Sequence, residues 1–156
     1  MTRTDYYNSP TAPTPNSIKV AVSALVRDDQ GRILMIRRSD NNKYSIPGGG
    51  LEAGETVSEA VVREVKEETG IDVRVTDIIG VFSNPGHVIA YDDGEVRQEF
   101  SICFHAEPVG GKLQTSIESH EVSWVAPEAL SSLDIHPSIM LRIEQGLNHG
   151  DTPYFT

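Results

Sequence analysis

The chain has 156 residues, of which 38% are hydrophobic and 23% charged, a composition typical of one globular domain. Its formal net charge of −10 argues against binding to a nucleic-acid polymer, because proteins that bind the phosphate backbone normally present a basic surface. A small phosphorylated ligand remains compatible with this charge, since a bound cation inverts the local field. The longest mostly apolar run, residues 20–26, is too short to cross a membrane, and we expect a cytoplasmic protein.

The first expected unit is a proline-rich leader, residues 1–17. We expect it to be irregular, either as a frayed end or as an arm that packs on a partner subunit, so a homodimer is one interpretation. Residues 18–27 and 32–38 are rich in Val and Ile, and the turn-forming segment 28–31 joins them. This pattern predicts two strands that pair as a hairpin.

A glycine-rich turn at 48–50 leads into the most clearly marked helix of the chain. The sequence Thr-Val-Ser-Glu that begins at Thr56 is a capping box, in which the threonine oxygen accepts an N–H of the first turn and the glutamate reaches back. Valines at every fourth position over 57–65 predict an apolar stripe. Gly70 predicts the end of the helix.

Three glutamates, Glu64, Glu67 and Glu68, lie in the last two turns of this helix at positions i, i+3 and i+4. They therefore share one helix face, where like charges repel. The negative end of the helix dipole disfavours anions at the same place. We expect a compensating cation, and an oxygen-binding divalent ion such as Mg²⁺ fits this donor set.

Further strands and helices are expected downstream. The strands are 71–82, 96–107 and 121–125, a loop spans 83–95, and the helices begin at Pro127 and Pro137. Gly146 is expected to end the final helix. Strands separated by single helices predict an α/β fold with a mixed β-sheet and helices on both faces. We expect a single domain over 18–150 and a short tail over 151–156.

The segment 49–71 matches a known motif at every specified position. These positions are Gly49, Glu55, Arg63, Glu64, Val65, Glu67, Glu68, Gly70 and Ile71. They reproduce the pattern G-x5-E-x7-R-E-U-x-E-E-x-G-U, where U is bulky and apolar, so the chain resembles the Nudix hydrolases, which include MutT-like proteins. The likeness extends over roughly 17–146. It implies the Nudix-type α/β/α sandwich.

The resemblance also implies a chemistry, the divalent-metal-dependent hydrolysis of a nucleoside diphosphate linked to another moiety. The expected cofactor is Mg²⁺ or Mn²⁺, and the substrate is a small molecule. By resemblance, the metal ligands are the three helix glutamates, the carbonyl of Gly48 and Glu118. Glu55 and Arg63 support the loop and helix together with Gly49 and Gly70. The catalytic candidates are Glu64, Glu67 and a further acidic residue before the Trp124 strand, for which Glu118 is the first choice and Glu121 the second.

Several side chains outside the motif are candidate substrate contacts. They are Arg37, Arg38, Arg97 and Tyr91, with Lys43 and His87 as further possibilities. Arginine forks match phosphate oxygens, but each of these charges is also explained as an ordinary surface residue. The histidines are scattered without metal-ligand spacing, so we interpret them as surface or satisfied buried residues.

The substrate is less well marked than the chemistry. In the family, a proline about fifteen residues past the motif accompanies ADP-ribose hydrolysis, and Pro85 lies fifteen residues after Gly70. ADP-ribose or another ADP-sugar is therefore the favoured substrate. One alternative is a nucleoside triphosphate pyrophosphohydrolase that releases a monophosphate and pyrophosphate. Further alternatives are a non-catalytic nucleotide sensor and a structural or partner-binding module.

Overall fold

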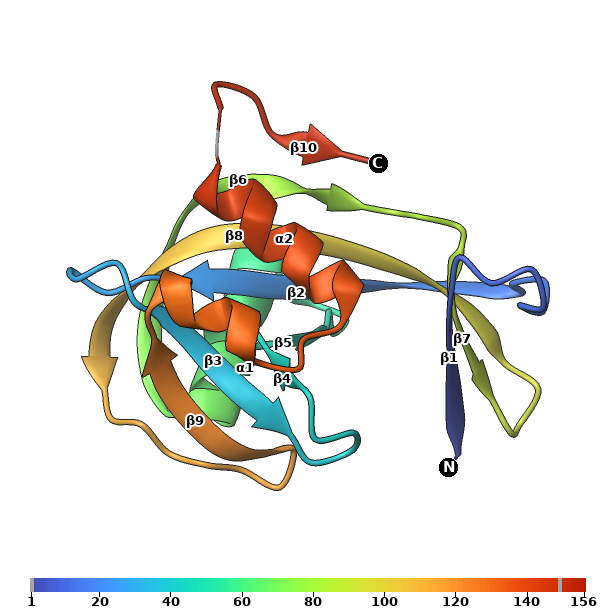
Figure 1. The fold of residues 1–156 in the computed structure, drawn as a ribbon, viewed down its shortest axis with the longest axis horizontal. Helices are drawn as coiled ribbons and strands as arrows, with labels where there is room; N and C mark the ends of the chain where they lie inside the picture. Colours follow the sequence, from blue (N-terminus) through green and yellow to red (C-terminus); the bar gives the residue numbers. More distant parts are fainter. Residues whose placement is uncertain (1, 149) are drawn as a thin grey trace.

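The computed structural model describes residues 2–148 and 150–156, which form two sheets and two α-helices (Figure 1). In chain order the elements are β1 (Arg3–Tyr7), β2 (Ser17–Val26), β3 (Ile33–Arg38), β4 (Tyr44–Ser45), β5 (Gly48–Gly50), α1 (Val57–Thr69), β6 (Ile71–Phe82), β7 (His87–Tyr91), β8 (Val96–Gly111), β9 (Ser119–Val125), a 3₁₀ helix (Pro127–Ser132), α2 (Pro137–Leu147) and β10 (Tyr154–Phe155).

The larger sheet follows the order β1-β7-β8-β2-β5, and β6 joins it beside β8 and carries β10. Strand β2 runs parallel to β8, and β10 runs parallel to β6, whereas the other pairs in this sheet are antiparallel. The smaller sheet has the order β4-β3-β9 and is antiparallel. The larger sheet is therefore mixed, as the sequence predicts.

Two hydrophobic clusters lie on opposite faces of the strands. Val22, Ala24 and Val26 of β2 belong to the cluster that contains the buried valines of α1, whereas Leu25 belongs to the cluster that α2 completes with Ile143. Because successive strand residues point to opposite faces, β2 contributes to both cores. Figure 1 shows α2 in front of the sheet and α1 behind it. The predicted α/β class with helices on both faces is confirmed.

The local signals at α1 are confirmed in detail. Thr56 is the N-cap, its side chain accepts from the Glu59 N–H, and the Glu59 side chain accepts from the Thr56 N–H. Gly70 caps the C-terminus with φ of 78°, in the left-handed region that glycine adopts most easily. Val61 and Val65 are fully buried. These features fix the start and the rotation of α1, and hence the face that carries the glutamates.

The predicted hairpin of 18–27 with 32–38 is wrong. Strands β2 and β3 lie in different sheets and share only the isolated bridge between Arg27 and Ile33. Both strands carry runs of side chains buried on both faces, so each is a central strand that needs two neighbours. Strand β2 finds them in β8 and β5, and β3 finds them in β4 and β9.

The leader and the loop 83–95 also differ from expectation, since each contains a strand. β1 pairs antiparallel with β7 over five residue pairs, from Arg3–Tyr91 to Tyr7–His87. β1 is a strand because it pairs with β7, which lies in a segment that we also expected to be irregular. Neither strand has a clear signal in its own sequence. None of the helices in the described part of the chain is long and apolar enough to cross a membrane.

The final helix continues past the expected stop. Gly146 lies inside α2, which ends at Leu147. A Cβ atom at Gly146 would meet the side chains of Leu25 and Ile79 closer than real Cβ atoms approach. This glycine therefore serves close packing of the helix against the sheet, and not helix termination.

Candidate active site

The glycine turn brings the backbone of β5 against β2 and against α1. Gly48 and Gly49 pair with Ser23 and Val22 of β2. A Cβ atom on Gly48 would collide with the Val22 carbonyl oxygen, and one on Gly49 would collide with the carboxylate of Glu64. Glycine at position 49 therefore leaves the room that the Glu64 side chain occupies, and glycine at position 48 allows β5 to lie close against β2.

Arg63 ties the turn to the helix. Its guanidinium donates to both carboxylate oxygens of Glu55, at 2.6 and 2.9 Å, and to the carbonyl of Gly50 at 3.0 Å. It also donates to Glu64 at 2.8 Å and to Glu67 at 3.3 Å. The hydrogen bond from Arg63 holds the pKa of Glu55 below its usual range. One cation thus positions two of the three helix glutamates and the loop that faces them.

Glu68 is the most deeply buried carboxylate of the motif, with 4% of its surface exposed. Its Oε1 accepts the Gly48 N–H at 3.2 Å. Burial raises the pKa of Glu68 to about 8, and the neighbouring carboxylates of Glu64 and Glu118 act in the same direction, against the effects of Gly48 and Arg38. A pKa raised in this direction is expected where negative charge lacks compensation.

The other acidic candidates lie at different distances from this centre. The Glu67 side chain is 60% exposed and is held by Arg63. Glu118 faces the cavity beside Glu68. Glu121 accepts instead from the Tyr44 hydroxyl at 3.3 Å and from Arg37 at 3.5 Å. The structure therefore brings Glu118, and not Glu121, to the motif glutamates.

A cavity of about 460 Å³ opens in front of the glycine turn, within the size range of small-molecule sites. Its charged and aromatic lining consists of Arg3, Lys19, Arg38, Asp40, Glu68, Tyr91, Arg97, Glu99 and Glu118, next to the glycines 48–50. Cations and carboxylates thus line the same cavity, which is the combination that a metal-bound anionic ligand requires.

The predicted substrate contacts separate into two groups. Arg38, Arg97 and Tyr91 line the cavity, and the Arg97 guanidinium lies 4.8 Å from the centre of the Tyr91 ring. Arg37 is absent from the described lining and packs over the Tyr44 ring. A change of register in the β3–β9 pairing falls between Arg37 and Arg38, and neighbouring strand residues point to opposite faces. Lys43 pairs with Asp134 at 3.3 Å, also away from the cavity.

Two cations of the cavity, Arg3 and Lys19, escaped sequence reasoning. Arg3 lies opposite Tyr91 in the β1–β7 pairing, so it reaches the cavity only because the leader forms a strand. The β-branched and aromatic residues Thr4, Tyr6 and Tyr7 favour a strand, but the prolines that follow them favour irregular structure.

Three further residues named from the sequence lie outside the lining of the large cavity. Pro85 lies in a turn closed by the His87 N–H and the Asn84 carbonyl at 3.0 Å, where proline presets the backbone angle. Trp124 packs against the core cluster beside α1. His87 is buried and contacts Asp5, so it does not face the large cavity as a base or sugar contact would.

The donor set fits a hard divalent cation. It offers the carboxylates Glu64, Glu67 and Glu68, the backbone of Gly48 close to Glu68, and Glu118 in the same cavity near Glu68. All of these donors are oxygens, which Mg²⁺ and Mn²⁺ prefer. The raised pKa of Glu68 is the independent observation, because it marks a carboxylate whose charge nothing in the protein fully balances.

Comparison with known proteins gives several relatives. The chain is 42% identical over 121 residues to a MutT-like protein of Streptomyces ambofaciens, covering 78% of this chain and 71% of that protein. It is 39% identical over 113 residues to an ADP-ribose pyrophosphatase of Methanocaldococcus jannaschii, covering 67% of this chain and 60% of that protein. It is 29% identical over 126 residues to the nucleoside triphosphatase NudI of Escherichia coli K12, covering 76% and 89%.

Among solved structures, the MutT protein from Methanosarcina mazei Go1 matches with a TM-score of 0.64 and 30% identity, over 85% of this chain and 93% of that chain. The model of the NUDIX domain family matches residues 17–143, which include the glycine turn, α1 and every strand that builds the cavity except β1. The chain belongs to the NUDIX family and is a Nudix hydrolase.

Proposed function

We propose that this enzyme hydrolyses a phosphoanhydride bond in a nucleoside diphosphate linked to another moiety, with ADP-ribose or a related ADP-sugar as the favoured substrate. The observation that carries the proposal is the buried carboxyl of Glu68, which lies beside the glycine turn in a cavity that cations also line. Residence in the cytoplasm and assembly as a homodimer stay predictions.

Glu64, Glu67, Glu68 and the carbonyl of Gly48 would hold Mg²⁺ or Mn²⁺. A divalent ion in such a site neutralises diphosphate oxygens and lowers the pKa of a bound water. Arg63 keeps the helix and the turn at a fixed separation through its bonds to Glu55 and Gly50. Catalysis of this kind depends on positioning and electrostatics more than on covalent steps of the protein.

Arg38 and Arg97 would orient the diphosphate. Arg38 donates through Nε and Nη2 to Asp40, and Arg97 donates through the same two atoms to Glu95. These bonds hold each guanidinium in place and leave Nη1 to donate to a phosphate oxygen. Glu118 would accept the proton of the attacking water, because it is exposed, lines the cavity and lies near Glu68.

Two observations favour an ADP-sugar. A relative at 39% identity is an ADP-ribose pyrophosphatase. The cavity of about 460 Å³ is lined by basic side chains and by the Tyr91 ring, and a base can stack on an aromatic ring. Pro85 adds little, since it shapes a turn outside the described cavity lining. Nucleoside triphosphate hydrolysis is the second candidate, favoured by the likeness to NudI.

A substrate panel with product identification tests the proposal. ADP-ribose, another ADP-sugar and the common nucleoside triphosphates are incubated with Mg²⁺, and the products are separated by anion-exchange chromatography. We expect AMP and ribose 5-phosphate from ADP-ribose. A monophosphate with pyrophosphate as the fastest products would move the assignment to the second candidate. Saturable binding without turnover on any substrate would make the protein a nucleotide sensor instead.

A further inference from the structure

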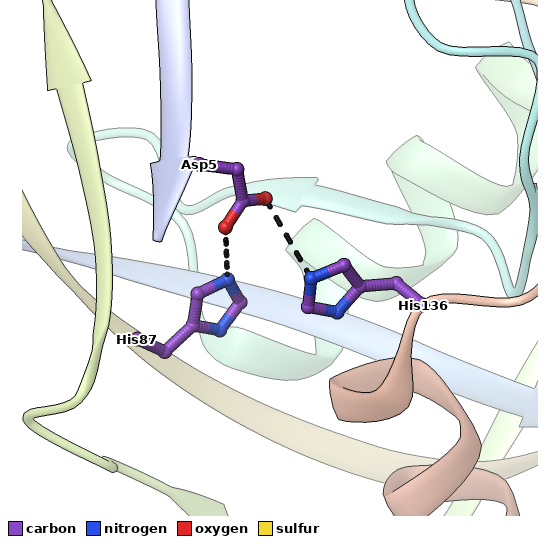
Figure 2. Close-up of side chains that lie close together, drawn as sticks. All are labelled: Asp5, His87 and His136. Atoms are coloured by element: carbon purple, nitrogen blue, oxygen red, sulfur yellow. Dashed lines mark ion pairs between the residues drawn. The ribbon is translucent and has the colours of Figure 1, made fainter. Parts of the chain in front are cut away.

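A second group of polar side chains lies where the N-terminal strand meets the body of the protein. Asp5 comes from β1, His87 begins β7, and His136 is the N-cap of α2. Figure 2 shows both imidazoles turning their Nε2 atoms toward the Asp5 carboxylate. Oδ1 of Asp5 lies 3.2 Å from Nε2 of His87, and Oδ2 lies 3.9 Å from Nε2 of His136.

The ligand atoms of these three residues all lie within 4.8 Å of one another, and this is the one set of three or more His, Cys, Asp or Glu so gathered among residues 2–148 and 150–156. The motif glutamates are more widely spread. In a tetrahedral zinc site the ligand atoms are about 3.4 Å apart, given bonds of about 2.1 Å. The His87–Asp5 separation of 3.2 Å lies close to that value, and the His136–Asp5 separation of 3.9 Å is about half an ångström longer.

The buried nitrogen of His87 is the second, independent observation. His87 is 8% exposed, and its Nε2 makes no hydrogen bond of good geometry, although Oδ1 of Asp5 lies 3.2 Å away. A buried polar atom without a partner is costly. Since this atom points to the Asp5 carboxylate, a cation bound to that carboxylate and to the two imidazoles would satisfy it.

The contacts of His136 favour a neutral imidazole with a supported second nitrogen. Its Nδ1 lies 2.8 Å from the Ser138 hydroxyl and 3.1 Å from the Ser138 backbone nitrogen. When Nε2 binds a metal, Nδ1 carries the proton and donates to the hydroxyl, as metal-binding histidines commonly do. The backbone N–H of Ser138 then loses its acceptor, so metal binding exchanges a helix cap for this hydrogen bond.

From this geometry we propose that Asp5, His87 and His136 form a second metal site, separate from the glutamates, that takes a transition-metal ion of the Zn²⁺ class. Nitrogen donors distinguish it chemically from the all-oxygen set, because imidazole suits Zn²⁺ whereas Mg²⁺ prefers oxygen ligands. Three protein ligands leave a fourth position open. The ion would fasten β1 to β7 and to the start of α2.

Arg3 is the internal competitor of such an ion. Its guanidinium lies 3.7 Å from Oδ2 of Asp5, and a bound cation must take over this carboxylate. Arg3 and Arg38 line both the large cavity and a smaller one, of about 110 Å³, that Asp5, His87 and His136 also line. Removal of Arg3 should therefore strengthen metal binding, a direction that a general loss of structure would not produce.

The test is calorimetric titration of ZnCl₂ into the full chain after treatment with a chelator, without nucleotide or Mg²⁺. We expect one strong site per chain, weakened at least ~10-fold in Asp5→Asn and in His87→Asn, because even loss of an outer-sphere partner costs that much. Arg3→Gln should bind more tightly than the wild type. His120→Ala, which changes an exposed histidine outside the group, is the matched control and should bind normally.

Two further measurements keep the outcomes separate. X-ray absorption at the zinc edge of the wild type should report two imidazole nitrogens and carboxylate oxygen, whatever the variants do to folding. Glu68→Gln should retain the zinc site. The proposal is overturned if the wild type binds no zinc, if binding disappears in Glu68→Gln but persists in Asp5→Asn and His87→Asn, or if the absorption spectrum shows oxygen ligands alone. None of these results bears on the hydrolase assignment.

Discussion

Two regions of the molecule gather charged side chains by different routes. At the glycine turn and α1, the participants lie within one short stretch of chain, and helix spacing places them on one face. At the junction of β1, β7 and α2, Asp5, His87 and His136 come from segments far apart in the chain. The first arrangement is visible in the sequence as a motif, whereas the second exists only after the strands have paired.

The largest expected effect concerns the first region. Glu68→Gln removes a ligand charge but keeps the shape of the side chain. We expect turnover to fall by about 10³-fold, because loss of roughly 4 kcal/mol of electrostatic stabilisation corresponds to three factors of ten. Steady-state kinetics with saturating Mg²⁺ measures it. Wild-type turnover in this variant would mean that the buried carboxyl is only structural.

The sequence predicted this region well because its rules are local. The capping box at Thr56, the valine stripe and the stop at Gly70 depend on residues a few positions apart, for which helix geometry alone suffices. The contact of Arg63 with Glu67 follows from the same helix spacing, whereas its contact with Glu55 in the loop is what the family resemblance implies. The helix signals themselves need no long-range placement.

The remaining features depend on tertiary pairing. The strand at Arg3 forms because β7 offers an antiparallel partner, and the separation of β2 from β3 follows from the burial of both faces of each strand. The histidines were interpreted from sequence spacing alone as scattered. Spacing along the chain carries no information about His87 and His136, which the fold brings to the same carboxylate.

The next largest effect concerns Glu118, a loop residue that the fold places near the motif glutamates. Glu118→Gln should lower turnover by about 10²-fold, the usual contribution of a positioned acid or base, because Glu118 lines the cavity near Glu68. Glu121→Gln is the matched control, and it should leave turnover close to wild type, since Tyr44 and Arg37 hold that carboxylate elsewhere. If Glu121→Gln lost more turnover than Glu118→Gln in the same kinetic assay, Glu121 and not Glu118 would be the acid or base.

A smaller effect is expected from two adjacent glycines. Gly49→Ala places a Cβ against the Glu64 carboxylate, whereas Gly50→Ala meets nothing within 4 Å. We expect Gly49→Ala to lose about tenfold in turnover, because displacement of a positioned group by a fraction of an ångström is costly. Gly50→Ala should stay near the wild type. Equal losses would show that the turn requires glycine flexibility and not the space beside Glu64.

The last effect is a dependence of stability on pH that distinguishes the two regions. In metal-free protein the pKa of Glu68 is raised from 4.5 to about 8, so the folded state binds the extra proton between these values and stability falls as pH rises through them. The pKa of Asp5 is lowered, since its His87, His136 and Arg3 partners outweigh burial, so its contribution is lost as pH falls.

Thermal unfolding in EDTA across this pH range measures both contributions. Glu68→Gln should remove the decline of stability toward pH 8. Added Mg²⁺ should reduce this decline in the wild type, because an ion that binds only the folded state stabilises that state. An unchanged slope in Glu68→Gln would assign the alkaline decline to another group.

The central claim is that a divalent ion compensates the acidic cluster of α1, and Mn²⁺ binding tests it most directly. The electron paramagnetic resonance signal of free Mn²⁺ is followed as wild-type protein is added in the presence of AMP, and again with Glu68→Gln. The account predicts that the wild type removes the free signal stoichiometrically, and that Glu68→Gln binds much more weakly. Equal binding by both proteins, or none by the wild type, would contradict it.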